Sequence, residues 1–480
     1  MKSALIDKLT KFAGKYDMFP ESGLVIACVS GGADSMCLLE ALLDISCDCG
    51  FSVGAAHFNH RLRGEESDRD EGFVRSYCEA RDVPFYSGSG DVSAYAAENK
   101  LGLELAAREM RYGFFCETAI ENGALRLATA HTVDDNAETV LLNLMRGTGA
   151  NGLSGIPPVR DITAGKNDVM IIRPMLHVCR REVMAFLVGR GIPFVEDSTN
   201  NMDIFTRNRI RHNVIPVLSG INLGLNEAIS ALTEISGADE RYLSQLAEEF
   251  IREHCDVRPV EEGRNGAACS GGPGAKRRRA ESSANAADIL GLPLAVSRRV
   301  IRDLCGGSLS FRHTEAILEL CNNGNPSASL DIPGMTVRRE YDRLVFGPAR
   351  EPAADVLPTV CPSDGDTAYF PGLGLKMSCK SVICNDKINK PFTFFLFKSV
   401  DICGKMTVRP RREGDFIRLS GGNGSRTLKK LFIDRRIPAW KRDLIPVIAD
   451  DKGVLAVYGI GMGDRAVPEP GDPAIRIDFE

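Results

Sequence analysis

Between residues 24 and 195, short apolar runs alternate with longer amphipathic runs. The first apolar run, 24–29, contains no polar side chain, as is typical of a strand buried on both faces of a parallel sheet. The same patterns predict further strands at 52–57, 126–131 and 170–173, and helices at 66–81, 103–121, 133–146 and 180–190. This alternation predicts an α/β domain with a doubly wound parallel sheet, whose ligands bind at the carboxyl ends of the strands.

The pattern changes after residue 216. Residues 225–255 form a long, charge-rich helical stretch, and 261–287 is rich in Gly, Ser and Ala, which predicts a disordered insertion. Helical runs at 295–304 and 312–322 and strand-like runs at 335–339 and 343–346 then predict a small α+β domain, and 454–458 predicts a strand of a final module. We therefore expect four parts: a catalytic domain over 1–218, a middle α+β domain over 219–350, a linker over 351–397, and a smaller C-terminal α+β domain over 398–480.

The composition narrows the class of protein. A chain of 480 residues is too long for one core, and its net charge of −5 does not suggest a nucleic-acid binder overall, so any such site must be a local patch. The fifteen cysteines include no Cys-x-x-Cys pair, which argues against a zinc ribbon or a thiol relay. No apolar run is long enough to cross a membrane, and we find no signal peptide, so we expect a cytoplasmic protein with reduced thiols and no membrane partner.

Polar residues follow three of the predicted strands. Residues 30–35 read Ser-Gly-Gly-Ala-Asp-Ser, and the helix that begins there directs unpaired N–H groups and its positive dipole end at an anion. The turn has no Lys at the position required by a Walker A loop. His57 and Asn59 at the end of the second strand could hydrogen-bond a nucleotide, and His131 ends the third. The three strand ends therefore converge on one predicted crevice.

The helix after His131 carries carboxylates in its first turns. Asp135 and Glu138 are three residues apart and can form one acidic pocket. Such a pocket suits Mg²⁺, which prefers oxygen ligands and shares them with substrate phosphates. It equally suits an ammonium group that must be held and deprotonated before it attacks. The residues alone leave both uses open.

Arginines are spaced to share helix faces in two places. Arg108 and Arg111 are three residues apart on the helix predicted at 103–121, where they suit polyphosphate, an RNA backbone or a solvated salt-bridged face. Arg207 and Arg211 are four apart, in a run that favours contact with phosphate or single-stranded RNA. A third basic segment is 401–443, which has twelve Lys or Arg against five Asp or Glu and predicts contact with a phosphate backbone.

Several of these strings together are specific. They are SGGADS, HFNHRLR, AHTVDDNAET, LMRGTG, EDSTNNMDIFTRNRIR and VRPRREGD. The chain resembles the tRNA(Ile)-lysidine synthases, a family of N-type ATP pyrophosphatases with a PP-loop, densely over 24–216 and more loosely beyond. The resemblance implies ATP and Mg²⁺ as cofactors, adenylation of C2 of the wobble cytidine in a CAU-anticodon isoleucine tRNA, and attack by the ε-amine of free L-lysine. The lysidine formed would change decoding from AUG to AUA.

The resemblance also implies roles for individual residues. Ser30, Gly31, Gly32, Ala33, Asp34 and Ser35 would cradle the pyrophosphate, and the nucleotide would further contact His57, Asn59, Arg108 and His131. Asp34 and Asp135 are expected at Mg²⁺, Asp135 and Glu138 at lysine or the reacting base, and Arg207 near the phosphates or RNA. The expected RNA contacts are Arg111, Arg211, Arg409, Arg411, Arg412, Lys429, Lys430 and Arg435. Asn136 stands where many members carry Gln, and a homodimer is left as an option.

Three other functions use similar parts. A PP-loop tRNA thiolation enzyme would adenylate a similar carbonyl but would need paired cysteines for sulfur transfer, which this chain lacks. A tRNA-binding module without catalysis would be expected to have lost Asp34, Asp135 or Glu138, and all three are present. A glutamine-dependent amidotransferase would need an attached glutaminase, for which residues 1–23 leave no room.

Overall fold

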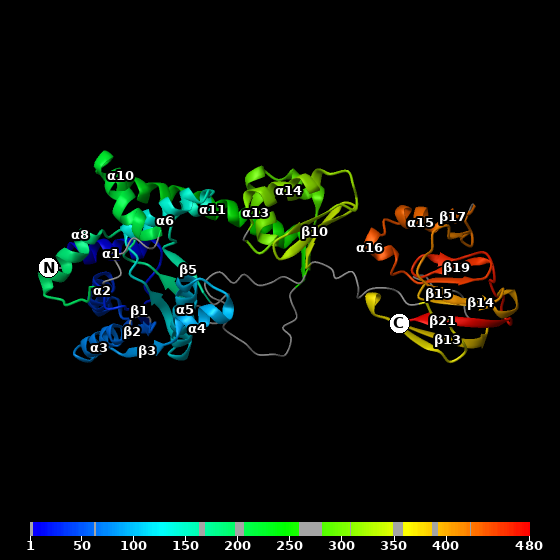
Figure 1. Ribbon diagram of the computed structural model, residues 1–480, viewed down its shortest axis with the longest axis horizontal. Coiled ribbons are helices and arrows are strands. Elements are labelled where there is room, and N and C mark those ends of the chain that lie inside the picture. The colour runs from blue at the N-terminus through cyan, green and yellow to red at the C-terminus, as the bar shows by residue number, and fades with distance from the viewer. Residues whose placement is uncertain are drawn as a thin grey trace. The chain divides into compact units, whose positions relative to one another are not determined.

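The computed structural model describes residues 3–61, 64–162, 169–196, 206–258, 281–307, 309–348, 359–385, 392–422 and 424–480. These residues form two compact units, one of residues up to Leu246 and one from Ala247 onward (Figure 1). The helix α11 (Leu225–His254) belongs in part to each unit, as expected for the long charge-rich helical stretch after residue 216.

The first unit is built on one six-stranded sheet. Its strands are β1 (Leu24–Cys28), β2 (Ser52–Asn59), β3 (Phe85–Ser89), β4 (Ala124–Ala128), β5 (Val159–Asp161) and β6 (Met170–Ile172), in the order β3-β2-β1-β4-β6-β5. All neighbours are parallel except β5, which runs antiparallel to β6. From β1 the chain adds β2 and β3 on one side of β1, and it then crosses over to place β4 on the other side of β1. The strand order therefore reverses between β1 and β4. Sheets of this kind bind ligands at the carboxyl ends of the strands at such a switch point.

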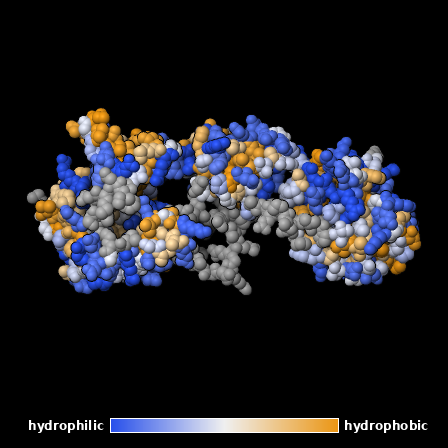
Figure 2. Space-filling view, in the orientation of Figure 1, coloured by the Kyte–Doolittle hydropathy of each residue, from blue (hydrophilic) through white to orange (hydrophobic). Residues whose placement is uncertain are grey.

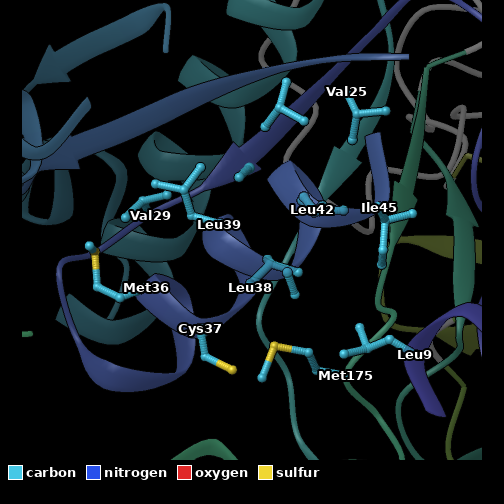
Figure 3. Packing of buried hydrophobic residues seen from close by; sticks show 14 of the residues in the cluster. Leu9, Val25, Val29, Met36, Cys37, Leu38, Leu39, Leu42, Ile45 and Met175 are labelled. Carbon is cyan, nitrogen blue, oxygen red and sulfur yellow. The ribbon is translucent and has the colours of Figure 1, made fainter. Parts of the chain in front are cut away.

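Helices cover both faces of this sheet. Besides α11, the helices of this unit are α1 (Ala4–Lys15), α2 (Ala33–Cys49), α3 (Glu65–Glu79), α4 (Val92–Asn99), α5 (Leu103–Glu121), α6 (Val133–Met145), α7 (Ala150–Leu153), α8 (Arg180–Arg190), α9 (Thr206–Arg209), the π-helical turn Ile210–Val214 and α10 (Ile215–Ile221). On one face, α2 packs Met36, Leu39 and Leu42 against Val25 and Val29 of the β1 segment (Figure 3). On the other face, α5 buries Tyr112 and Phe115 with Ile26.

The predicted fold class, a doubly wound α/β sheet followed by smaller α+β parts, is confirmed. The predicted helices at 103–121 and 180–190 coincide with α5 and α8, and the other predicted strands and helices of this unit fall within a few residues of observed ones. The hydrophobic patterns did not predict α1, β3, α4 or β5. Two of these are short: β3 is a five-residue strand, and β5 a three-residue edge strand paired only to β6.

The middle part of the second unit is a five-stranded antiparallel sheet covered by three helices. Its strands, in the order β7-β8-β11-β10-β9, are β7 (Cys255–Arg258), β8 (Glu281–Asn285), β9 (Ser329–Ile332), β10 (Met335–Glu340) and β11 (Arg343–Gly347), and its helices are α12 (Ala286–Gly291), α13 (Leu294–Leu304) and α14 (Phe311–Asn322). The expected insertion over 261–287 lies outside the described residues up to 280. Its last residues are ordered as β8 and the start of α12, because β8 pairs with β11.

The C-terminal domain, residues 359–480, begins earlier than the sequence suggested. Its elements are β12 (Thr367–Phe370), β13 (Leu375–Ile383), β14 (Phe394–Lys398), β15 (Thr407–Arg409), β16 (Phe416–Ile417), β17 (Arg426–Thr427), α15 (Leu428–Asp434), α16 (Ala439–Arg442), β18 (Val447–Asp450), β19 (Gly453–Val457), β20 (Gly461–Met462) and β21 (Pro473–Phe479). The expected linker over 351–397 therefore contains strands β12, β13 and most of β14. β13 and β14 both pair with β21 from the end of the chain, and β12 pairs with β13. The pairings with β21 are too distant in sequence for local patterns to reveal.

Apolar side chains lie on the surface of one helical segment of the first unit. Figure 2 shows hydrophobic surface over α10, where Val217 is 63% and Ile221 80% exposed. Within the described residues, no single helix is long and apolar enough to cross a membrane. The bent pair Thr206–Ile221 and Leu225–His254 meets the length and composition requirement only when both parts are counted together.

Candidate functional site

The turn after β1 leaves backbone N–H groups available at the start of α2. Gly31 has a φ of +91°, and a Cβ there would also contact the side chains of Val74 and Phe73, so a glycine suits this position. The two serines brace the loop, since the Ser30 N–H donates to Ser35 Oγ at 3.1 Å and Ser35 Oγ donates to the Gly32 carbonyl at 2.9 Å. No side chain caps the helix at Gly32. This end of α2 can therefore receive an anion through its N–H groups and dipole.

Asp34 lies in the first turn of α2 and is paired with an arginine that the sequence analysis did not single out. Arg180 Nη1 donates to Asp34 Oδ1 at 2.6 Å, and the Arg180 main-chain N–H donates to Asp134 Oδ2 at 2.9 Å. Burial raises the pKa of Asp34, and the Asp135 charge adds to this, whereas Arg180 lowers it. Arg180 thus links α2, α6 and α8, and the carboxylates of Asp34 and Asp135 lie near each other.

His57 and Asn59 are buried at the end of β2, and both form hydrogen bonds within the protein. His57 Nδ1 donates to the Val29 carbonyl at 2.9 Å, and burial lowers the pKa of His57, which favours the neutral ring. Asn59 Nδ2 donates to Asp68 at 2.9 Å and to Glu71 at 3.3 Å. These contacts fix the loop after β2 beside the strand end that precedes Ser30.

Asp135 closes a capping box at the start of α6. Its Oδ2 accepts from the Thr132 N–H at 2.9 Å, while Thr132 Oγ1 accepts from the Asp135 N–H at 3.4 Å. Its other oxygen, Oδ1, accepts from Arg207 Nη2 at 3.1 Å. Although burial raises the pKa of Asp135, Arg207, His131 and Arg211 lower it, and the net direction is downward. Asp135 is therefore an ionised group at the switch point of the sheet.

Glu138 is the most buried charge of the site, with 1% of its surface exposed. Arg207 Nε donates to Glu138 Oε2 at 2.6 Å, and Arg211 donates through Nε to Oε1 and through Nη2 to Oε2 at 3.1 Å. The predicted spacing of four residues does bring both arginines to one carboxylate, across the π-helical turn that begins at Ile210. Although burial lowers the pKa of Arg211, Glu138, Asp135 and Asp34 raise it. The sequence-predicted Asp34, Asp135, Glu138, Arg207 and Arg211 thus form one cluster.

His131 lies between β4 and α6. Its Nδ1 is 2.9 Å from Thr129 Oγ1. Burial lowers the pKa of His131 to about 3, which outweighs the opposite effect of Asp135. The imidazole is therefore neutral at pH 7 and can hydrogen-bond a ligand without adding charge.

Two carboxylates are suited to a shared divalent cation. Among the described residues, no group of three or more His, Cys, Asp or Glu side chains is arranged to hold a metal ion. Mg²⁺ is commonly held by one or two carboxylates together with substrate phosphates and water. Asp34 and Asp135 lie near each other beside the anion-binding end of α2, so the donor set fits that kind of site.

Asn136, which stands where many members of the family carry Gln, is buried, and both the oxygen and the nitrogen of its side chain form hydrogen bonds. Its Oδ1 accepts from the Ile156 N–H at 2.8 Å, and its Nδ2 donates to Thr233 Oγ1 at 3.4 Å. Gly155, with a φ of +65°, leaves space for this amide, since a Cβ there would lie 2.2 Å from Asn136 Oδ1. Asn136 therefore attaches the segment at Gly155 and Ile156, together with α11, to α6.

Arg108 and Arg111 lie on α5, on the face of the sheet opposite α2. Their guanidinium carbons are 5.4 and 5.6 Å from the centre of the Tyr112 ring. The spacing that predicted a shared face is confirmed. The ring beneath them is a feature that the sequence analysis did not use.

The basic residues expected to contact RNA in the C-terminal domain have two different environments. Arg409 is 5% exposed, and its Nη1 and Nη2 donate to the Asp415 carboxylate at 2.8 and 2.9 Å. This geometry favours a structural role for Arg409. Arg411 is half-buried and paired with Asp443 at 2.7 Å. The others are exposed: Arg412, Lys429, Lys430 and Arg435.

Family models match three parts of the chain. One described as a PP-loop domain matches residues 1–218, one described as a TilS substrate binding domain matches 285–345, and one described as a TilS substrate C-terminal domain matches 406–479. They lie respectively on the doubly wound sheet, on the middle part of the second unit and on the C-terminal domain.

Curated relatives match nearly the whole chain. A tRNA(Ile)-lysidine synthase from Geobacillus kaustophilus is 32% identical over 471 residues, which cover 95% of this chain and 95% of the relative. One from Geobacter sulfurreducens is 33% identical over 99% of this chain and 96% of its own length. One from Bacillus subtilis is 31% identical over 92% of this chain and 90% of its own length.

Proposed function

Because the chain belongs to the tRNA(Ile)-lysidine synthase family, we propose that it joins free L-lysine to C2 of the wobble cytidine in an isoleucine tRNA with a CAU anticodon. The reaction has two steps. The cytidine O2 attacks the α-phosphorus of ATP and releases pyrophosphate, and the lysine ε-amine then attacks C2 and releases AMP. The enzyme is thus an ATP-dependent ligase that forms a carbon–nitrogen bond.

The observation that carries this proposal is the meeting of three carboxylates beside the braced loop of residues 30–35. Asp34 comes from α2, and Asp135 and Glu138 come from α6. Arg207 contacts both α6 carboxylates, and the Asp34 and Asp135 charges influence each other. An adenylating enzyme that uses an amine needs this combination of an anion-binding loop and an acidic pocket.

The loop of residues 30–35 holds the pyrophosphate part of ATP in this proposal. Its N–H groups stabilise the negative charge that develops on the departing pyrophosphate, and the serine bridges keep them in place before the reaction. Asp34 and Asp135 would hold Mg²⁺, whose positive charge offsets that of the phosphates. His57, Asn59 and neutral His131 line the strand ends where the nucleoside would bind.

Glu138 and Asp135 bind the lysine ε-ammonium in this proposal. The pocket stabilises cations in the present structure, since both carboxylates accept hydrogen bonds from Arg207. An ammonium group placed there would be oriented for attack and could lose a proton to a carboxylate, because only the neutral amine is a nucleophile. Arg207 then holds the carboxylates in place and faces the reacting groups.

Binding of tRNA is assigned to exposed basic residues of the C-terminal domain, together with Arg211 beside the site. Arg412, Lys429, Lys430 and Arg435 are exposed, so they can reach phosphates without breaking internal contacts. Arg411 would have to exchange its Asp443 partner for a phosphate.

The cysteines favour this function over tRNA thiolation. Burial raises the pKa of Cys28 and of Cys37 to about 12, so neither forms a thiolate at neutral pH. Sulfur transfer needs a reactive thiolate, and Cys28, at the end of β1 next to the loop of residues 30–35, is kept protonated.

The direct test incubates the purified protein with ATP, Mg²⁺, labelled lysine and a CAU-anticodon isoleucine tRNA. We expect label to enter the RNA with release of AMP and pyrophosphate, and no incorporation when the substrate is a methionine tRNA with the same anticodon. Tight tRNA binding without pyrophosphate release would instead identify a binding module. Incorporation of sulfur from a sulfide donor, without lysine, would identify a thiolase.

A further inference from the structure

Four arginines form a group beside the site; the resemblance implied a nucleotide contact for one and an RNA contact for another, and it gave no role to the other two. Arg108 and Arg111 belong to α5, Arg160 belongs to β5, and Arg173 follows β6; we call them the arginine cluster. Within the described part of the chain, none of the four guanidinium groups forms an ion pair with an Asp or Glu. Four neighbouring positive charges without a carboxylate are unusual, because like charges repel and arginines normally find partners.

Arg173 is the innermost member. It is 3% exposed, its Nη1 donates to the Pro157 carbonyl at 2.5 Å, and its buried Nε has no hydrogen-bond partner among the described residues. A buried charged donor without an acceptor is costly for a protein to keep. The orphan Nε therefore points to an acceptor that arrives with a ligand.

Tyr112 lies close to three members of the arginine cluster: Arg108, Arg111 and Arg173. Its ring is 4% exposed, packs in the apolar cluster under α5, and lies beneath the guanidinium groups of Arg108 and Arg111. Burial lowers the pKa of Arg173, the Tyr112 hydroxyl raises it, and the charges of Arg160 and Arg108 lower it again. Arginines from α5, β5 and the end of β6 therefore surround one aromatic residue.

The cluster is open to solvent at one end and buried at the other. Arg108 is exposed, Arg111 and Arg160 are half-buried, and Arg173 is buried. Arg173 and Arg111 also lower the pKa of His131, so the buried end lies near the proposed reaction site. The cluster is nevertheless on the α5 face of the sheet, whereas the loop that receives pyrophosphate begins α2 on the other face.

We propose that the arginine cluster binds a phosphodiester of the RNA substrate next to the reacting base, an inference that rests on the proposed function. Guanidinium groups match the two free oxygens of a phosphate with paired N–H donors. ATP carries the same chemical group, but its pyrophosphate has its own loop on the opposite face. This assigns Arg108, which we expected from the sequence to bind the nucleotide, to the RNA instead, and adds Arg160 and Arg173 as binding residues.

The test uses the full-length protein with Arg160→Gln and Arg111→Gln, which remove partly exposed charges, and with Arg181→Gln as a matched control. Arg181 is exposed on α8, so its substitution removes the same charge away from the cluster. We expect each cluster variant to bind the CAU-anticodon tRNA about fivefold to tenfold more weakly, with a salt slope smaller by about 0.7 to 0.9. The ATP dissociation constant should change less than twofold.

A second measurement identifies the phosphate. Synthetic anticodon stem-loops carry one neutral methylphosphonate at each position around the reacting cytidine. We expect one substitution to weaken binding to the wild-type protein and to Arg181→Gln, but to have no further effect on Arg160→Gln. The proposal is overturned if the cluster variants bind RNA as the control does, or if they lose affinity for ATP and not for RNA. Loss of lysine incorporation by the wild-type protein would instead overturn the proposed function, which these binding measurements do not require.

Discussion

The acidic site of the first unit and the basic surface of the C-terminal domain use charge in opposite ways. Glu138 is almost fully buried, and two arginines from one short segment hold it. Lys429 and Lys430 extend into solvent from α15 and form no ion pair with another described residue. The first arrangement fixes positions before a substrate arrives, whereas the second attracts a polyanion and tolerates many geometries.

Arg409 shows that burial, and not the domain, decides how a charge is used. It lies in the same basic segment as Lys430, yet it is buried and held bidentately by Asp415. Single changes at buried, paired charges should therefore have large effects on activity or stability. Changes at exposed charges should be small, additive and dependent on salt.

The largest expected effect is that of Asp34→Ala. Without this carboxylate the site loses one proposed Mg²⁺ ligand, and we expect tRNA-dependent pyrophosphate release to fall at least about 100-fold. The fold should persist, because the exposed pair with Arg180 contributes only about 0–1 kcal/mol. Arg180→Gln breaks the same ion pair and serves as the control. Wild-type pyrophosphate release by Asp34→Ala would show that the loop is wrongly assigned.

Glu138→Gln separates the two chemical steps. We expect lysine transfer to fall about 100-fold or more, the range of a lost acid–base group, with a smaller loss of pyrophosphate release. A two-stage assay that measures pyrophosphate release and then incorporation of labelled lysine makes the distinction. Asp135→Asn should impair both stages, since Asp135 is also a proposed metal ligand. If Glu138→Gln loses both stages equally and added lysine rescues neither, Glu138 belongs to the metal site.

Arg409→Met tests whether the buried Arg409 of the basic segment stabilises the domain and does not bind RNA. Removing the guanidinium leaves Asp415 half-buried without its partner, and we expect the C-terminal domain to lose about 3 kcal/mol of unfolding free energy. Denaturant unfolding measures this loss. The salt slope of tRNA binding should stay unchanged under conditions where the variant is folded. A lower slope with unchanged stability would instead make Arg409 a direct RNA contact.

The exposed counterpart is the triple variant Lys429→Gln, Lys430→Gln and Arg435→Gln. Its unfolding free energy should stay within about 0.5 kcal/mol of the wild type, because these side chains are exposed and form no ion pair with another described residue. Its tRNA affinity should fall, and the slope of log affinity against log salt should decrease by about 0.7–0.9 for each phosphate that the variant no longer neutralises. ATP binding gives the control readout. An unchanged slope would show that α15 is not part of the RNA-binding surface.

The sequence predicted the parts of the site that depend on local spacing. Three features follow from residue spacing within a short segment. They are the strand–turn–helix at residues 24–49, the shared face of Arg108 and Arg111, and the contact of both Arg207 and Arg211 with Glu138. These features need no knowledge of distant residues.

The features that the sequence did not predict depend on distant partners. Arg180 reaches Asp34 from 146 positions away, and Arg173 meets Tyr112 from another element of the sheet. The strands within the expected linker are held by β21 near the end of the chain. Arg409 resembled its neighbours in composition, and only its burial beside Asp415 sets it apart.

The smallest expected effect concerns pH. His131 has a pKa of about 3 in the folded protein and about 6.5 when unfolded, so between these values the unfolded chain binds a proton that the folded chain does not. Stability contributed by neutral His131 is thus fully present above pH 6.5 and is lost as the pH falls towards 3. The loss from His131 is at most about 1.4 kcal/mol per pH unit, and buried His57 and half-buried His177, whose pKa values are also lowered, add to it.

The comparison between the two regions is sharpened by following both as the pH falls from 7.0 to 5.5. Since no histidine follows His313 in the sequence, unfolding of the C-terminal domain should hardly respond over this range, because its Lys and Arg side chains stay charged. The first unit should lose stability as the pH falls. In His131→Gln, the slope of its unfolding free energy against pH should be smaller by up to about 1.4 kcal/mol per pH unit. Urea unfolding followed by hydrogen exchange reports on each region separately. An identical slope in the wild type and in His131→Gln would mean that His131 binds protons equally in the folded and unfolded chains. Its pKa would then not be lowered in the folded site, and its neutral role beside Asp135 would be wrong.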